Sequence, residues 1–160
     1  MSITTAVLIS LGICLVAAVL EGLCAGKNVK SYFATLQFPP YAAPLGVWYG
    51  IGFVYYAIFF ALIFRILRHE GDFGLRVGTL SLIIFMMAVN ALWNYVFFRA
   101  RNLFISFVAA SLFPVLDIAL LLCLIRFDSV AAWALVPYLL YRLYAVWWGY
   151  ALWKMNRRRT

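Results

Sequence analysis

Four side chains that can form hydrogen bonds stand inside a hydrophobic run, in the stretch AVNALWNYVFF at residues 88–98: two asparagines, a tryptophan and a tyrosine. Asn90, Trp93, Asn94 and Phe97 are spaced i, i+3, i+4 and i+7, so a helix would place them along one face. Lipid offers an amide no hydrogen-bond partner, and we therefore expect this face to point into the protein. It could serve helix–helix hydrogen bonding, worth about 0.6 kcal/mol on average, or form the wall of a ligand cavity.

A second face of this kind is found in VPYLLYRLYAVWWGYALWK, residues 136–154. Large aromatic side chains alternate there with small residues, which is typical of a helix face with a recess in it. The residues near this face are Tyr138, Tyr141, Arg142, Ala145 and Gly149, with Trp148 beside them. Aromatic residues at helix ends anchor a protein at the membrane interface, but that role does not explain Tyr141 and Arg142, which lie near the middle of the run.

Asp117 and Arg142 are the charged residues farthest from the ends of the hydrophobic runs. A charge in mid-bilayer costs roughly 2.5–3.5 kcal/mol, so each needs a partner or a water-filled site. Their depths in the membrane differ by only roughly 5 Å at 1.5 Å per residue. We therefore predict an intramembrane Asp117–Arg142 pair, which would be either structural or part of a polar pocket.

The composition identifies the solvent around these residues. Of 160 residues, 68% are hydrophobic and 11% are charged, whereas a soluble domain has about 25% charged residues. An apolar run of about 20 residues crosses a bilayer as a helix. Five runs of this kind predict an all-α integral membrane protein, a five-transmembrane-helix bundle in one domain over residues 1–160, with helices roughly at 4–24, 45–67, 77–98, 103–126 and 129–153.

The basic residues predict the orientation in the membrane. With five spans, eight lysines and arginines share one side and four share the other. The larger group should be cytoplasmic, giving an outside N-terminus and a cytoplasmic C-terminus, in a bacterial cytoplasmic membrane. The Arg157–Arg159 run would anchor to anionic lipid. Because these charges flank the spans and form no single face, we expect no nucleic-acid partner. The cysteines and His69 lack ligand spacing, so no metal site is expected.

Three sequence blocks resemble the TspO/MBR family, the tryptophan-rich sensory proteins related to the translocator protein or peripheral benzodiazepine receptor. The N-x-x-W-x-x-x-F-F pattern of that family is reproduced by Asn90, Trp93, Phe97 and Phe98. Its P-Y-x-x-W pattern with a closing asparagine resembles Pro137, Tyr138, Tyr141 and Asn156, with tyrosine at the tryptophan. Its P-x-W-x-P-P element and a later tyrosine resemble Pro39, Tyr41, Pro44 and Tyr56.

The resemblance implies a membrane receptor or carrier, often a homodimer, that binds planar hydrophobic ligands in a pocket near the first loop. Porphyrins, haem-like tetrapyrroles and sterol-like lipids are the implied ligands, none of them an obligatory cofactor. The implied ligand-binding residues, taken with the two polar faces, are Tyr41, Trp48, Gly52, Tyr56, Asn90, Trp93, Asn94, Tyr138, Tyr141, Arg142 and Ala145. A pocket tryptophan of the family corresponds to Gly52, or to Trp48 if the alignment shifts by four residues.

Two other functions are left open by the sequence. A small transporter could use the Asp117–Arg142 site, or a membrane enzyme could modify a tetrapyrrole. The replaced tryptophans argue against porphyrin degradation, and no catalytic residue is identified because there are no paired carboxylates and no nucleophile–histidine set. For the homodimer, Gly46-x-x-x-Gly50 and Ser106-x-x-x-Ala110 have the small-residue spacing that lets helices approach closely, although packing within one chain would use the same spacing.

Overall fold

Five long helices make up most of the protein, as the computed structural model shows for residues 1–126 and 128–157. They are α1 (Ile3–Ala25), α3 (Leu45–Arg68), α4 (Phe73–Asn94), α5 (Leu103–Ile125) and α6 (Ser129–Asn156). Each is long and apolar enough to cross a membrane, with α4 extended to Arg99 by the π-helical segment η1 (Tyr95–Arg99). The predicted five-helix fold is confirmed. A short helix, α2 (Val29–Thr35), lies between the first two spans and was not predicted.

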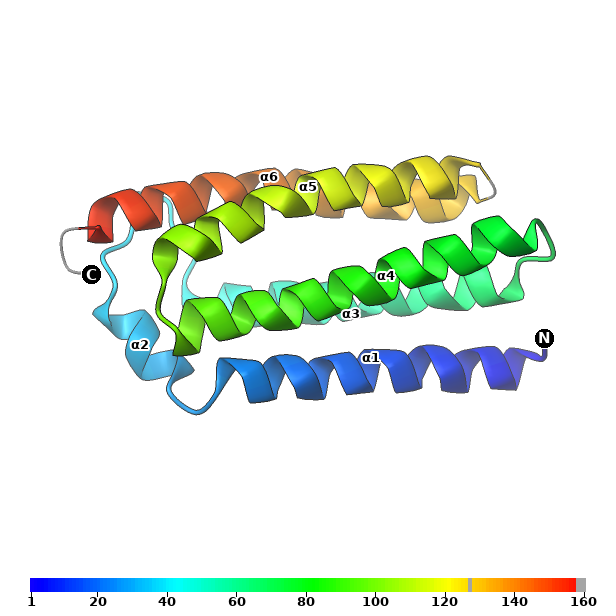
Figure 1. Cartoon of the computed structure of the whole chain (residues 1–160), viewed down its shortest axis with the longest axis horizontal. Helices are drawn as coiled ribbons and strands as arrows, with labels where there is room; N and C mark the ends of the chain where they lie inside the picture. The colour runs from blue at the N-terminus through cyan, green and yellow to red at the C-terminus, as the bar shows by residue number, and fades with distance from the viewer. Residues whose placement is uncertain (127, 158–160) are drawn as a thin grey trace.

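The helices run side by side and alternate in direction, as Figure 1 shows. The N-terminus lies at one end of the bundle, together with the α3–α4 and α5–α6 connections. Helix α2, the α4–α5 connection and the C-terminus lie at the other end. Helix α5 packs most extensively along α6, while α1 packs against α3 and α4. This arrangement surrounds an interior that all five long helices can reach.

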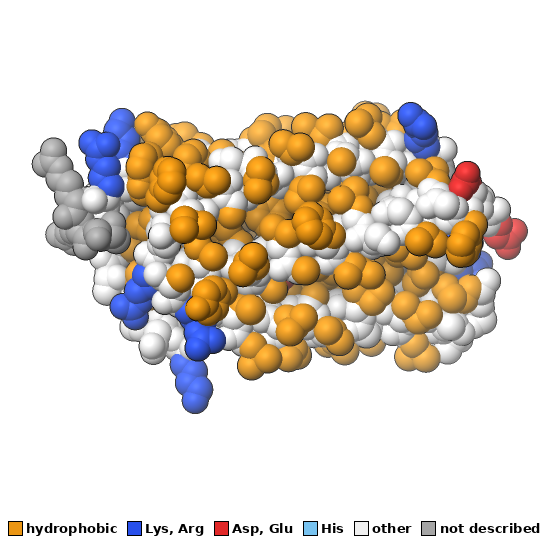
Figure 2. Space-filling model, in the orientation of Figure 1, with side chains coloured by type: hydrophobic (Ala, Val, Ile, Leu, Met, Phe, Trp, Pro, Cys, Tyr) orange, Lys and Arg blue, Asp and Glu red, His pale blue; other side chains and the backbone are white. Residues whose placement is uncertain are grey.

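The outside of the bundle is suited to lipid. Figure 2 shows apolar side chains over the length of the bundle and basic side chains gathered toward its ends. Large hydrophobic residues such as Leu8, Phe53 and Val115 are more than half exposed, which a bilayer tolerates and water does not. The protein is therefore an integral membrane protein. Of the predicted lipid anchor, Arg157 is described, whereas Arg158 and Arg159 lie outside the described residues.

Polar residues cap the starts of four long helices. Ser2, Asp72, Asn102 and Asp128 each accept a hydrogen bond from a backbone N–H in the first turn, which satisfies a group that the helix itself leaves unpaired. The Asp72 cap also explains why α4 begins at Phe73 and not near residue 77. Hydropathy alone excluded this first turn because it contains Arg76.

A packed core fills the half of the bundle nearest to the end where the N-terminus lies. Its fully buried side chains include Phe59, Ile63, Ile83, Leu124 and Leu135.

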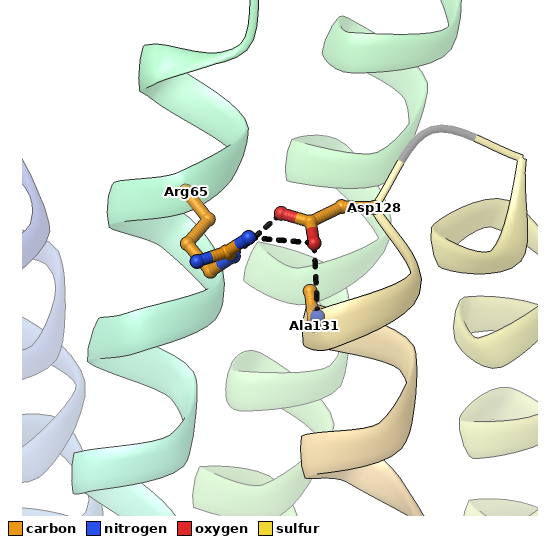
Figure 3. A network of polar contacts seen from close by, with 3 residues as sticks. All are labelled: Arg65, Asp128 and Ala131. Carbon is orange, nitrogen blue, oxygen red and sulfur yellow. Dashed lines mark hydrogen bonds and ion pairs between the residues drawn. The ribbon is translucent and has the colours of Figure 1, made fainter.

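An ion pair joins α3 to the start of α6 at this same end, as Figure 3 shows. The Arg65 guanidinium donates to both carboxylate oxygens of Asp128, at 2.6 and 2.9 Å, and Asp128 also accepts from the Ala131 N–H. The hydrogen bonds from Arg65 hold the pKa of the Asp128 carboxyl below its ordinary value.

Candidate ligand cavity

A cavity of about 520 Å³ lies in the other half of the bundle, toward α2. Ligand pockets in proteins typically have volumes of about 300–1,000 Å³. Side chains from all five long helices, from α2 and from η1 line it. The predicted ligand-binding residues found on its wall are Trp48, Gly52, Tyr56, Asn90, Trp93, Asn94, Tyr138, Tyr141, Arg142 and Ala145. The two polar faces noted in the sequence thus meet at one cavity.

Tyr41 is the predicted ligand-binding residue that does not line the cavity. Its side chain is 93% exposed, and its φ of 67° places it in a tight turn before α3. Its carbonyl oxygen accepts a hydrogen bond from the Tyr144 hydroxyl. Tyr41 therefore contributes its backbone to the connection that covers the cavity, and its ring points elsewhere.

The α4 wall of the cavity is aromatic and firmly positioned. The Trp93 ring stacks on Phe97, with centroids 5.0 Å apart and an interplanar angle of 15°. Its indole Nε1 donates to the Ser106 carbonyl of α5 at 2.9 Å, which fixes the orientation of the ring. The wider turn of η1 lets both Phe97 and Phe98 line the cavity. Such π-helical turns occur often at functional sites.

Asn90 has a charged partner that sequence reasoning missed. Its side-chain amide donates to Glu21 of α1 at 2.8 Å, and both residues line the cavity. Glu21 lies near the end of the first span, where a carboxylate can reach the membrane interface. It lines the cavity instead, as do Gly22 and Ala25 on the same helix. The one signal available in the sequence was an acidic residue within an otherwise apolar run.

Arg142 and Asp117 lie next to each other in the interior. The distance from Arg142 Nε to an Asp117 carboxylate oxygen is 3.5 Å, and Asp117 is fully buried. The guanidinium carbon also lies 4.0 Å from the centroid of the Phe113 ring and 4.8 Å from that of Tyr138. The two rings hold the cation by cation–π contact. Arg142 lines the cavity, whereas Asp117 lies behind it.

The chain between α2 and α3 closes the end of the cavity. The Trp48 ring lies 4.6 Å from that of Trp148, and its Nε1 donates to the Ala43 carbonyl. The Tyr144 hydroxyl accepts from the Ala43 N–H. Asn156, at the end of α6, exchanges hydrogen bonds with both backbone groups of Gln37, at 3.0 and 2.9 Å. These bonds hold residues 36–44 in place; the role of Asn156 was not predicted.

The two small-residue motifs lie on different sides of the protein. Ser106 is 3% exposed, and Ala110 lines the cavity. The Ser106–Ala110 pair thus faces the interior, and its predicted role in a dimer contact was wrong. Gly46 and Gly50 have open space beyond them, so a homodimer through that face stays a prediction.

These features define a class of protein: an α-helical integral membrane protein that encloses a cavity of ligand size lined with aromatic side chains. Residues 10–154 match the TspO/MBR family, and the chain belongs to that family. A relative is the "Tryptophan-rich protein TspO" of Bacillus cereus, which is 21% identical over 131 residues, covering 79% of this chain and 82% of the relative.

Proposed function

We propose that this protein is a membrane receptor or carrier that binds planar hydrophobic ligands, such as porphyrins and other tetrapyrroles or sterol-like lipids, in the cavity. The observation that carries this proposal is the aromatic lining. Trp93 and Phe97 present stacked rings on one wall, and Trp48 with Trp148 forms a second aromatic group. Flat apolar molecules stack on such rings, and the polar edges of Asn90 and Tyr141 would orient a ligand.

The shape of the interior supports binding more than passage across the membrane. The cavity ends near Tyr55, Phe113 and Tyr138. Beyond them, toward the N-terminal end, lies the packed core around Ile63 and Leu124. A transporter that used the Asp117–Arg142 pair would have to open this core, whereas ligand binding needs access from one end only.

We infer that the α2 end of the bundle faces the cytoplasm, with the C-terminus there and the N-terminus outside, in a bacterial cytoplasmic membrane. At the α2 end lie Lys27, Lys30, Arg99, Arg101, Lys154 and Arg157, and at the other end Arg65, Arg68, Arg76 and Arg126. The larger basic group marks the cytoplasmic side. The organism of the Bacillus cereus relative supports the bacterial assignment.

Absorption titration of the purified protein with protoporphyrin tests the proposed function. We expect a shifted, saturable Soret band.

The Asn90→Leu variant removes the hydrogen bond to Glu21 and should weaken binding by about 1–3 kcal/mol if a polar group of the ligand is left unpaired. The Trp93→Ala variant should also weaken binding, and Tyr141→Phe, which removes only the hydroxyl, should do so less. Melting curves control for the cavity that Trp93→Ala opens. Unchanged affinity in both of the first two variants would return Asn90 and Trp93 to a purely structural role.

A further inference from the structure

Arg142 is a strong hydrogen-bond donor without an acceptor. The residue is 8% exposed and its side chain 10% exposed. None of its nitrogens donates a hydrogen bond within the described part of the chain, and Nε is enclosed without a partner. A guanidinium in the membrane interior normally pairs or meets water, because an unpaired charge there is costly. Arg142 lines the cavity, so an acceptor can reach it from there.

Asp117 satisfies this cation only in part. At 3.5 Å from Nε the contact is longer than a charge-assisted hydrogen bond, which is about 2.7–2.9 Å, and both carboxylate oxygens of Asp117 lack hydrogen-bond donors in the described residues. The rings of Phe113 and Tyr138 flank the guanidinium. These cation–π contacts are not hydrogen bonds, and the terminal nitrogens of the guanidinium form a fork that matches a carboxylate.

We propose that Arg142 binds a carboxylate of the ligand, so that the cavity selects planar hydrophobic molecules that carry an acidic side group. The inference rests on the proposed function and narrows its ligand class. Among the described residues that line the cavity, the other charged one is Glu21, which accepts a hydrogen bond from the Asn90 amide. Its carboxylate would repel an anionic group. The cavity therefore orients such a ligand with its acidic edge toward α6 and away from α1.

Protoporphyrin IX and its dimethyl ester provide a matched pair of ligands, since they share the ring and differ in the two carboxylates. The measurement is the affinity of each for the purified protein in the same detergent. A charge-assisted hydrogen bond leads us to expect that the wild-type protein binds the acid at least about tenfold more tightly. In Arg142→Met this preference for the acid should disappear. In Arg126→Met, a matched control at the far end of the bundle, it should stay.

Two variants guard against a folding failure, because Arg142→Met leaves Asp117 as an unpaired buried carboxylate. Asp117→Asn keeps Arg142 and should retain or increase the preference for the acid. Asp117→Asn combined with Arg142→Met removes both charges and should abolish it. Glu21→Gln should strengthen binding of the acid more than that of the ester.

The two proposals fail in different ways. If the wild-type protein binds neither molecule, the proposed function is wrong and this inference falls with it. If it binds both equally, or if the preference persists without Arg142, ligand binding stands and the carboxylate site is wrong. If none of the Arg142 variants folds, the wild-type protein and Arg126→Met decide. Equal wild-type affinities for the acid and the ester would overturn the inference. A tenfold preference for the acid in both proteins would support it.

Discussion

Replacing Asn156 with leucine should loosen the chain segment that closes the cavity. Asn156 is 3% exposed, and its amide is the contact that joins the end of α6 to Gln37. Leucine has a similar size but neither accepts nor donates, so the packing would largely remain while three hydrogen bonds are lost, two with Gln37 and one to the Leu152 carbonyl of the same helix. Only the two bonds with Gln37 hold the segment. At about 1 kcal/mol for each bond, the closed position of residues 36–44 should lose about 2 kcal/mol. This corresponds to roughly a 30-fold larger open population.

Hydrogen–deuterium exchange in lipid nanodiscs measures this opening directly. In Asn156→Leu, peptides that cover residues 36–44 should exchange roughly 30-fold faster, while peptides from the core of α3 should not change. Ser111→Ala is a matched control, because it removes a hydrogen bond within α5, from the Ser111 hydroxyl to the Phe107 carbonyl, and should leave the segment unaffected. A bound ligand should also dissociate faster from Asn156→Leu. Unchanged exchange over residues 36–44 would refute the view that Asn156 holds this segment.

Three further predictions follow from the rest of the molecule. Asp128→Asn keeps a helix cap but loses the ion pair with the partly exposed Arg65, so it should cost about 0.2–1 kcal/mol of stability, seen as a small drop in melting temperature. Arg65 lowers the pKa of the Asp128 carboxyl. The contribution of the ion pair to stability should therefore be complete above the ordinary carboxyl pKa of about 3.9, and it should fade as the pH falls through the lower pKa of Asp128 in the folded protein. An equal loss of stability in Asp128→Asn at every pH would contradict this. Gly46→Leu should abolish a cross-linked homodimer, and an intact dimer would place the contact elsewhere. Reporter fusions should locate the N-terminus outside and the C-terminus in the cytoplasm, and an external C-terminus would overturn the orientation.

The five spans could be predicted because hydropathy and helix length fix them together. The short helix α2 could not, since its seven residues include Lys30 and lack a long apolar run. The π-helical turn after Asn94 could not be predicted either. It depends on which backbone carbonyl each N–H selects, and a run such as YVFFR fits either hydrogen-bonding pattern.

The cavity wall was partly predictable because polar residues in a span have few alternatives to an interior position. Periodicity was sufficient to place Asn90, Trp93 and Arg142 on inward faces. Glu21 and Asn156 were missed since both lie near the end of a span, where a polar residue can equally reach water. Tyr41 was assigned to the wall through the family resemblance, but the turn that contains it directs its ring outward.

Blocking the cavity is the most direct test of the central claim. Ala145 lines the cavity, and a phenylalanine there would place a ring in the space proposed for the ligand. Ala57, on the exposed side of α3, provides the matched control for adding the same ring. We expect protoporphyrin to give a saturable Soret shift with the wild-type protein and with Ala57→Phe, and no saturable shift with Ala145→Phe that has folded normally. Wild-type affinity in Ala145→Phe would contradict binding in this cavity.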